Sequence, residues 1–397
     1  MSARARLSAR ARRITVFAGD LGPRAVGRWR GGVRLHGLIE CLLALGHDVG
    51  VIGFGPAEGL GDLGSRVASV HVAPRRAAPA GLRDLLRAAR ASRGELLLAH
   101  KLRPLSFGVA LLARRLSRRP LMLDLDDDEM RFAPTSSGWR ALARAEGPWR
   151  QLEHPRYFRW LERRARSVDR LTAASTELAR RFDGELLPTA RDTDRLDPSR
   201  FDGRAERARL GLDPAQRLLL FAGAPRPYKG LEDLLHALEA LPAEPPCRLL
   251  ILGGSPYDDY HDHLMRGWPQ RVVRRPAVAP AEVPAYLAAA DLVVVPQRDT
   301  PITRCQLPLK LLDGMAMARP VLVTRVGDLP EIVGDAGFVA EPGDPDSLRR
   351  QLEAFLGDAE GARRRGEVGR QRALQRFSVK AVARRLEALL PPADAGG

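Results

Sequence analysis

The chain has 397 residues, 45% of them hydrophobic, and a formal net charge of +16. This length exceeds what one hydrophobic core normally organises and predicts two domains. No apolar run approaches the roughly 20 residues that span a bilayer, and the one after the basic N-terminus is too short for a signal-peptide core, so we expect a cytoplasmic protein. The three cysteines show no metal or disulfide spacing, which fits a reducing compartment: Cys41, Cys247 and Cys305.

The positive charge first suggests a nucleic-acid partner. However, all but four of the 64 basic residues are arginines. They are spread along the whole chain and match no nucleic-acid motif, so we expect no such partner. An anionic membrane face is another use of the charge, because each basic residue near the lipid contributes about 1 kcal/mol. The expected location is therefore cytoplasmic, and a peripheral contact at the inner membrane face stays open.

The N-terminal half alternates short apolar runs with segments of helical periodicity. Residues 1–13 are expected to form a disordered basic tail. Beyond the tail, strands are predicted at 14–20, 48–54, 66–72, 95–100, 120–126 and 168–175, and helices at 33–45, 82–92, 105–118, 139–166 and 176–182. Alternating buried strands and helices predict a parallel sheet in an α/β domain.

The segment 187–203 is rich in proline, aspartate and arginine, which is typical of an interdomain linker. A second alternating run follows it. Strands are predicted at 217–225, 247–254, 271–278, 292–296, 320–324 and 337–341, and helices at 231–240, 282–289, 308–318, 346–356 and 378–390. The sequence therefore predicts two doubly wound domains, whose ligands usually bind at the carboxyl ends of the strands.

The first candidate site is the strand, turn and helix of FAGAPRPYKGLEDLLHAL, residues 221–238. Its glycines and prolines shape a tight turn that presents Arg226 and Lys229 at the carboxyl end of a strand. An ammonium is a compact point charge that suits phosphate, and guanidinium is a planar fork. Two such cations can hold a diphosphate, and the alternative is a plain loop with solvated charges.

The second candidate site is QLPLKLLDGMAMARPVLVT, residues 306–324. Pro308 suits the first turn of a helix, where free N–H groups and the helix dipole form an anion site. Lys310 adds a full charge there. Asp313 lies three residues on, and its carboxylate can accept hydrogen bonds from the two vicinal hydroxyls of a ribose. Alternatively, Lys310 and Asp313 only pair with each other on the helix surface.

Together these segments resemble the donor-binding half of glycosyltransferase family 4, the retaining transferases of the GT-B fold. The resemblance covers about residues 14–390 and is strongest over 217–345. It implies an α/β protein with two doubly wound Rossmann-like domains facing a central cleft. The implied boundaries are an acceptor-side domain at 14–200, a donor domain at 201–376, a helix at 377–390 that returns to the first domain, and a tail at 391–397.

The family holds the donor diphosphate with an Arg/Lys pair, which here is Arg226 and Lys229. Its usual arginine directly after the strand glycine is absent, because Ala224 stands there, and Arg226 is expected to substitute. The resemblance implies a nucleotide-sugar donor as substrate. It implies no further cofactor and no metal.

The family's Glu-x7-Glu motif is altered in this chain. Its second acid aligns with Asp313, which keeps a carboxylate for the ribose, and its first aligns with Cys305. A branch of the family carries a QxPxK loop at this point. The five donor-binding residues expected from that loop are Gln306, Leu307, Pro308, Leu309 and Lys310.

The N-terminal half resembles the family less closely. Gly31 and Gly32 match the glycine loop that lets backbone amides approach the donor phosphate. Lys101, at the end of a predicted strand, is a further candidate anion ligand, and His100 can reach the same site.

An acidic run, DLDDDEM, follows the strand at 120–126. The family often has a histidine where this chain has Asp126. We expect Asp126 and Asp127 to orient or deprotonate the acceptor hydroxyl, with a solvated acidic loop as the alternative. The run can be misread as a metal-binding DxD motif, and no metal is assigned to it.

The resemblance implies retaining transfer of a sugar to a hydroxyl acceptor, in the synthesis of a glycan, a polysaccharide or a glycolipid. The acceptor can be a glycan, a lipid-linked molecule or a small molecule. A non-catalytic nucleotide-binding scaffold, a nucleotide-sugar epimerase and a nucleic-acid binder remain alternatives. A nicotinamide dehydrogenase is disfavoured because the first strand and loop, FAGDLGPRAVG, lack GxGxxG.

Overall fold

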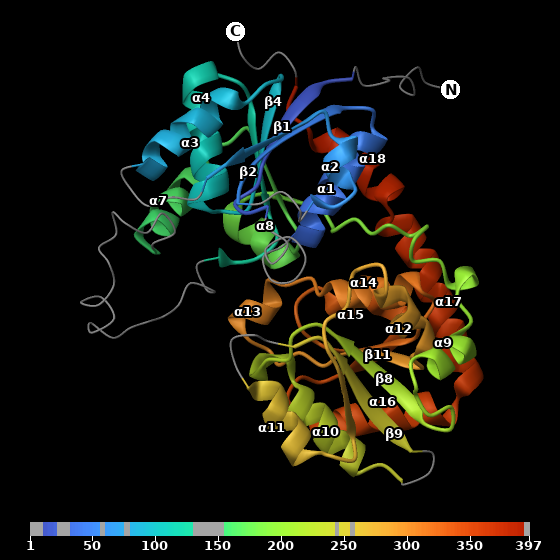
Figure 1. The fold of residues 1–397 in the computed structure, drawn as a ribbon. Coiled ribbons are helices and arrows are strands. Elements are labelled where there is room, and N and C mark those ends of the chain that lie inside the picture. The colour runs from blue at the N-terminus through green and yellow to red at the C-terminus, as the bar shows by residue number, and fades with distance from the viewer. Residues whose placement is uncertain are drawn as a thin grey trace, which may run out of the picture. The chain divides into compact units, whose positions relative to one another are not determined.

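A computed structural model describes residues 11–21, 32–55, 60–74, 80–129, 155–242, 246–254 and 259–392. Contacts divide the chain into two compact units: unit 1 is Met1–Ala190 with Val379–Gly397, and unit 2 is Arg191–Ser378. Each unit is a parallel sheet with helices on both faces (Figure 1). Several expectations fall outside the described residues: residues 1–10 of the basic tail, Gly31, the helix over 139–154, and residues 393–397.

The sheet of unit 1 has seven strands in the order β3-β2-β1-β4-β5-β6-β7, all parallel. Their bounds are β1 Arg13–Phe17, β2 Asp48–Phe54, β3 Ser69–Ala73, β4 Leu96–His100, β5 Leu121–Leu125, β6 Arg170–Ala173 and β7 Glu185–Leu186. The order reverses between β1 and β4. Such a switch point is where open α/β sheets usually bind ligands, at the carboxyl ends of the strands.

Helices cover both faces of this sheet. Their bounds are α1 Gly32–Ala44, α2 Leu63–Arg66, α3 Ala80–Ala91, η3 Pro104–Gly108, α4 Val109–Ser117, α7 Pro155–Ala165, α8 Thr176–Phe182 and α18 Val379–Leu389. Helices α1 and α18 lie side by side on one face, and α3 and α4 lie on the other (Figure 1). The Cys41 thiol of α1 lies 3.6 Å from the Val379 carbonyl of α18.

The sheet of unit 2 has six parallel strands in the order β10-β9-β8-β11-β12-β13. The strands are β8 Arg217–Ala222, β9 Cys247–Leu252, β10 Val272–Arg275, β11 Leu292–Val295, β12 Val321–Thr324 and β13 Gly337–Ala340. Successive side chains of a strand point to opposite faces. Thus Leu218 and Leu220 belong to one core, and Leu219 and Phe221 to the other.

The helices of unit 2 fill these two cores. They are η4 Pro198–Arg200, α9 Gly203–Arg209, η5 Pro227–Lys229, α10 Leu231–Glu239, α11 Tyr260–Gly267, α12 Val283–Ala289, α13 Pro301–Arg304, α14 Leu309–Ala316, α15 Leu329–Val333, η6 Gly334–Ala336, α16 Pro345–Gly357 and α17 Ala359–Arg376. No helix in the described ranges of either unit is long and apolar enough to cross a membrane.

The structure confirms the α/β fold class predicted from the sequence, and it corrects details. The strand expected at 14–20 ends at Phe17. Helix α17 was missed because it buries only small residues, Ala362, Gly366, Gly369 and Ala373, which give no strong apolar period. A Cβ on Gly366 would stand 2.2 Å from the Ala318 carbonyl oxygen, so the small residue permits the close packing of this helix.

Candidate functional site

The turn after β8 is held in a shape that only glycine permits at two points. Gly223 has φ 126° and Gly230 has φ 69°. A Cβ on Gly230 would stand 1.8 Å from the Pro296 carbonyl oxygen. The backbone N–H of Arg298 donates to the Tyr228 carbonyl at 3.0 Å. The turn that carries Lys229 is therefore fixed against the loop that follows β11.

A partly buried polar network supports that loop. Thr300 and Thr303 form a capping box for α13, and the Thr303 hydroxyl donates to the Arg298 carbonyl at 2.7 Å. Lys229 Nζ donates to Gln306 Oε1 at 2.7 Å, and Gln297 Nε2 lies 3.3 Å from the same oxygen. The two predicted anion-binding segments, more than 70 residues apart in sequence, therefore meet at Gln306.

Lys310 lies on the first turn of α14 and reaches the same place. Its Nζ stands 4.1 Å from the centre of the Phe221 ring and 3.6 Å from the point where a Cβ on Gly223 would lie. Burial, together with the nearby Lys229 ammonium, holds the pKa of Lys310 well below its usual value, although Asp313 opposes this. Among the described residues Lys310 forms no salt bridge with a carboxylate.

Asp313 is one turn further along α14 and nearly buried. Arg191 Nε donates to Asp313 Oδ1 at 2.5 Å. Burial raises the pKa of Asp313, while Arg191 and, more weakly, Lys310 oppose the rise. Asp313 is therefore not simply paired with Lys310 on the helix surface, which was the alternative expected from the sequence.

The other residues expected at this site differ in their surroundings. Arg226 is half-buried at the start of η5, and its carbonyl accepts the backbone N–H of Lys229 at 2.8 Å. Leu307 packs against one core of unit 2, Pro308 is buried, and Leu309 is half-buried. Cys305, in place of the first acid of the family motif, is buried with 1% of its surface exposed.

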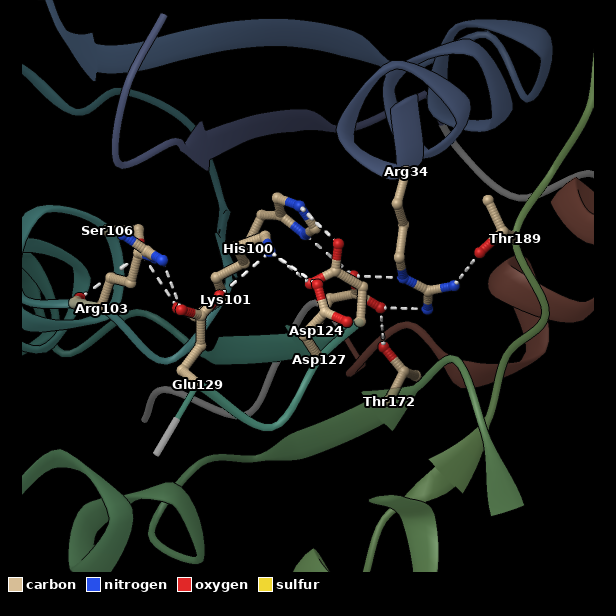
Figure 2. Close-up of polar contacts among 11 residues, drawn as sticks. Arg34, His100, Lys101, Arg103, Ser106, Asp124, Asp127, Glu129, Thr172 and Thr189 are labelled. Carbon is tan, nitrogen blue, oxygen red and sulfur yellow. Dashed lines mark hydrogen bonds and ion pairs between the residues drawn. The ribbon is translucent and has the colours of Figure 1, made fainter. Parts of the chain in front are cut away.

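In unit 1, a buried ion pair lies under the carboxyl ends of the central strands (Figure 2). Arg34 of α1 makes two contacts with Asp124 of β5, at 2.8 Å and 2.5 Å. The hydroxyl of Thr172 donates to Asp124 Oδ1 at 2.8 Å, and Arg34 donates to the Thr189 hydroxyl at 3.0 Å. Burial alone would raise the pKa of Asp124, but Arg34 and His100 outweigh it and lower that pKa.

Beside this pair, the side chain of Lys101 is surrounded by carboxylates. Its Nζ lies 2.9 Å from Asp126 Oδ1, 3.3 Å from Asp127 Oδ2 and 3.0 Å from Glu129 Oε1. Arg103 contacts the other oxygen of Glu129 (Figure 2). Lys101 has φ 73°, a left-handed conformation that is uncommon outside glycine. The surrounding contacts hold it in this conformation.

These contacts change the ionisation of the cluster. Burial would lower the pKa of Lys101, but Asp126, Glu129 and Asp127 outweigh it and raise that pKa. Burial would raise the pKa of Glu129, but Lys101 and Arg103 lower it to about 2. Asp127 keeps a raised pKa, since burial, Asp126 and Glu129 outweigh its contact with Lys101. The charge of Lys101 is thus balanced by carboxylates.

His100 lies between the Arg34–Asp124 ion pair and the acids around Lys101. Its Nδ1 lies 3.1 Å from Asp124 Oδ2, and its Nε2 lies 3.9 Å from Asp126 Oδ2. Because ionised Asp124 can only accept a hydrogen bond, Nδ1 is the donor of this contact, and Nε2 faces Asp126. Gly32 begins α1 and is buried. Among the described residues, no group of three or more His, Cys, Asp or Glu side chains is arranged to hold a metal ion.

Several residues that shape these sites were not predicted from the sequence. Asp124, a charged residue inside the buried strand LMLDL, carried a readable signal, because an ion in a strand interior requires a partner. Arg34 and Arg191 carried none, since they are two of many arginines. Gln297 was missed because its role depends on contacts that only the folded loop creates.

The geometry defines a protein of two Rossmann-like units in the GT-B class, with a cationic site in unit 2 and an acidic one in unit 1. Residues 216–358 match the family model "Glycosyl transferases group 1", and residues 31–193 match "Glycosyl transferase 4-like domain". The chain belongs to this family, glycosyltransferase group 1 or family 4, as the motifs predicted.

Two curated relatives illustrate the similarity. The chain is 32% identical over 222 residues to the D-inositol 3-phosphate glycosyltransferase of Segniliparus rotundus, which covers 54% of this chain and 48% of that protein. It is 30% identical to the MMP alpha-(1->4)-mannosyltransferase of Mycolicibacterium hassiacum, over 42% of this chain and 41% of that protein. The chain therefore matches about half the length of these relatives or less.

Solved structures agree on the fold. Anabaena Alr3699/HepE in complex with UDP and glucose has a TM-score of 0.75 at 19% identity, with 95% of this chain and 98% of that chain covered. WaaG, a glycosyltransferase involved in lipopolysaccharide biosynthesis, has a TM-score of 0.66 at 16% identity, with 96% and 100% covered. At this identity the likeness establishes the GT-B fold.

Proposed function

We propose that the protein is a retaining glycosyltransferase that moves a sugar from a nucleotide-diphosphate sugar to a hydroxyl of a glycan, a lipid-linked molecule or a small molecule. The observation that carries the proposal is that Lys310 lies beside Gly223 and close enough to the Lys229 ammonium for that charge to lower its pKa. Two ammonium groups in such surroundings repel each other, and a diphosphate can neutralise both. The relatives named above include a glycosyltransferase and a mannosyltransferase, which is consistent with this reaction class.

On the donor side, we assign the diphosphate to Arg226, Lys229 and Lys310, with the first turn of α14 adding its free N–H groups. Negative charge grows on the nucleoside diphosphate as its bond to the sugar breaks. Cations already in place stabilise that charge, which is usually the largest catalytic contribution. Asp313 offers carboxylate oxygens to the ribose.

On the acceptor side, we assign Asp126 and Asp127 to the hydroxyl that attacks. Lys101 restrains Asp126 at 2.9 Å and so fixes its orientation. The raised pKa of Asp127 suits a group that takes up a proton from a hydroxyl, because efficient proton transfer needs a pKa nearer the working pH. His100 Nε2 faces Asp126 and can support the same transfer.

We also propose a cytoplasmic protein that contacts an anionic membrane face through α7. Trp160 is 48% exposed on this helix, and the Arg164 guanidinium lies 5.5 Å from its ring centre. Aromatic rings favour the interface and arginines favour anionic lipid. Sedimentation with phosphatidylglycerol vesicles should remove the protein from solution, and Trp160→Ser should weaken this. Equal sedimentation with neutral phosphatidylcholine vesicles would refute the contact.

The test of the reaction is release of nucleoside diphosphate from UDP-glucose, GDP-mannose, dTDP-glucose or ADP-glucose, with a panel of glycan, lipid-linked and small hydroxyl acceptors. One donor should be turned over in an acceptor-dependent way, with and without EDTA. Tight binding of a nucleoside diphosphate without turnover on any acceptor would favour the nucleotide-binding scaffold instead. The buried Cys305, in place of the family's acid, is the feature behind that alternative.

A further inference from the structure

Arg191 is the first residue of unit 2, and its backbone is bonded to the last residues of the same unit. Its N–H donates to the Phe377 carbonyl at 2.7 Å, and it forms a parallel β-bridge with Ser378. Its side chain turns to α14, where Nε donates to Asp313 Oδ1 at 2.5 Å. Only 18% of the Arg191 side chain and 12% of the Asp313 side chain are exposed, so solvent screens this contact little.

We propose that Arg191 positions the Asp313 carboxylate for the ribose of the donor, and so makes the site selective for ribonucleotides. This inference rests on the proposed function, because it assigns a role at the same donor site. Arg191 acts through Asp313 and is a positioning residue. It lies outside the two segments that carry the family motifs.

The stereochemistry of the Arg191–Asp313 contact leaves room for the ribose hydroxyls. A carboxylate has about four lone-pair positions, and an arginine held through Nε occupies one of them. Among the described residues, Oδ2 of Asp313 accepts no hydrogen bond. One whole oxygen and a lone pair of the other are therefore left for two vicinal hydroxyls. A planar guanidinium also restricts the rotation of the carboxylate more than an ammonium would.

Arg191 also keeps the Asp313 carboxylate ionised. Burial favours the neutral acid at Asp313, and a protonated carboxyl is a poorer acceptor for two ribose hydroxyls. Two cations oppose this effect, and Arg191 contributes more than Lys310. Lys310 is also engaged with Phe221 and is the proposed diphosphate ligand. Arg191 is therefore the cation that keeps Asp313 available as a charged acceptor.

The alternative is that Arg191 competes with the ribose for the Asp313 carboxylate. Asp313 is one methylene shorter than the family's glutamate, so a guanidinium bound to it can also stand in the way of the ribose. Competition and positioning predict opposite signs when Arg191 is removed. The sign of the change therefore decides between them.

The experiment compares UDP and GDP with their 2′,3′-dideoxy forms by calorimetry, for the parent chain, Arg191→Leu and Arg191→Lys. Positioning predicts that Arg191→Leu weakens binding of the ribonucleotide roughly tenfold or more and leaves the dideoxy form within about twofold, as expected for a charge-assisted contact. Arg191→Lys should fall between, because it keeps the charge and loses the planar fork.

Arg207→Leu is the matched control. Arg207 pairs with Asp291 in the same unit and with similar burial, 12% and 22% of the side chains exposed. Asp291 also accepts the backbone N–H of Leu218, near the start of β8, so this pair lies at the amino ends of the strands, away from the carboxyl-end site. Both affinities should be unchanged in this variant.

Four results would overturn the inference. Equal losses for ribose and dideoxyribose forms in Arg191→Leu would mean a structural role, and a gain in ribonucleotide affinity would mean competition. If Arg191→Leu does not fold, Arg191→Lys decides alone, and an unchanged ratio of the two affinities refutes positioning. A parent chain that binds none of these nucleotides would overturn the proposed donor site and this inference with it.

Discussion

Lys101 of unit 1 and Lys310 of unit 2 both occupy the carboxyl-end region of a parallel sheet, yet their surroundings are opposite. Three carboxylates lie within 3.3 Å of the Lys101 ammonium, and they raise its pKa. Lys310 meets an aromatic ring and a second lysine, and its pKa falls. The first lysine has its counter-charge inside the protein. The second forms no salt bridge with a carboxylate among the described residues, so an anionic ligand would stabilise it.

This difference shows how a buried cation can be assigned a role from the charges around it. A buried charge whose partners are protein groups serves the architecture, because losing it strands the partners. A buried charge beside a like charge destabilises the ligand-free protein, and an oppositely charged ligand offsets this repulsion when it binds. The sequence predicts that Lys101 binds an anion, and in the structure its ammonium lies among the carboxylates of Asp126, Asp127 and Glu129.

The largest expected effect is on the stability of unit 1. Lys101→Met should lower the free energy of unfolding by about 3–5 kcal/mol, because it leaves buried carboxylates without their cation. Urea denaturation at pH 7 measures this. Lys380→Met is the control, since Lys380 is exposed on α18 and its replacement should change stability by less than about 0.5 kcal/mol. Similar values for the two variants would remove the contrast between the sites.

The next effect is on the rate of transfer. Asp126→Asn should lower the rate about 100-fold or more, as expected for loss of a group that assists proton transfer. Donor affinity should stay within about twofold, since Asp126 belongs to unit 1 and the proposed donor groups belong to unit 2. Steady-state rates and calorimetry on the same preparation separate the two quantities. A loss of donor affinity would reassign Asp126 to the donor.

A smaller effect, with two opposite signs, is expected in unit 2. Lys310→Met should weaken nucleoside diphosphate binding by about 1.5–3 kcal/mol, because a charge-assisted contact is lost. The same substitution should leave the ligand-free protein as stable as the parent or more so, since a repelled, half-buried ammonium is replaced by an apolar chain. Thermal unfolding with and without ligand measures both. A destabilised ligand-free variant would contradict the assignment.

The smallest effect is a change in acid sensitivity. The pKa of Glu129 is lowered from 4.5 to about 2, so its contribution to stability is present above pH 4.5 and is lost as the pH falls towards 2. Glu129→Gln should cost ~1–2 kcal/mol at pH 7 and flatten the fall in stability between pH 5 and 2. Urea denaturation across this range measures it. Glu360→Gln on the exposed face of α17 is the control, and its stability should depend on pH as that of the parent does.

Elements with strong periodicity were predictable from the sequence. The strand at 48–54 and the helix at 176–182 have the predicted bounds, because each combines a clear apolar pattern with a readable start or end. Helix α17 was not predictable, because its buried face consists of small residues that give no strong apolar period. The helix expected at 105–118 is present but opens with the π-helical turn η3, which periodicity does not encode.

The candidate site was predictable in part. Lys229, Lys310 and Asp313 could be chosen from motif and spacing, because strand ends and helix starts in an α/β fold collect at one edge of the sheet. The partners of these residues could not be chosen. Whether Lys101 faces phosphate or carboxylates, and whether Asp313 pairs with Lys310 or Arg191, depends on long-range packing that a single sequence does not specify.

Lys229 and Lys310 are proposed to hold a diphosphate together. The most direct test of this proposal is calorimetric titration of UDP, GDP, dTDP and ADP, each beside its monophosphate, into the parent chain, Lys229→Ala, Lys310→Ala and the double variant. The parent should prefer one diphosphate over its monophosphate, each single variant should lose part of this preference, and the double variant should lose nearly all of it. An unchanged preference in the double variant would contradict the proposal.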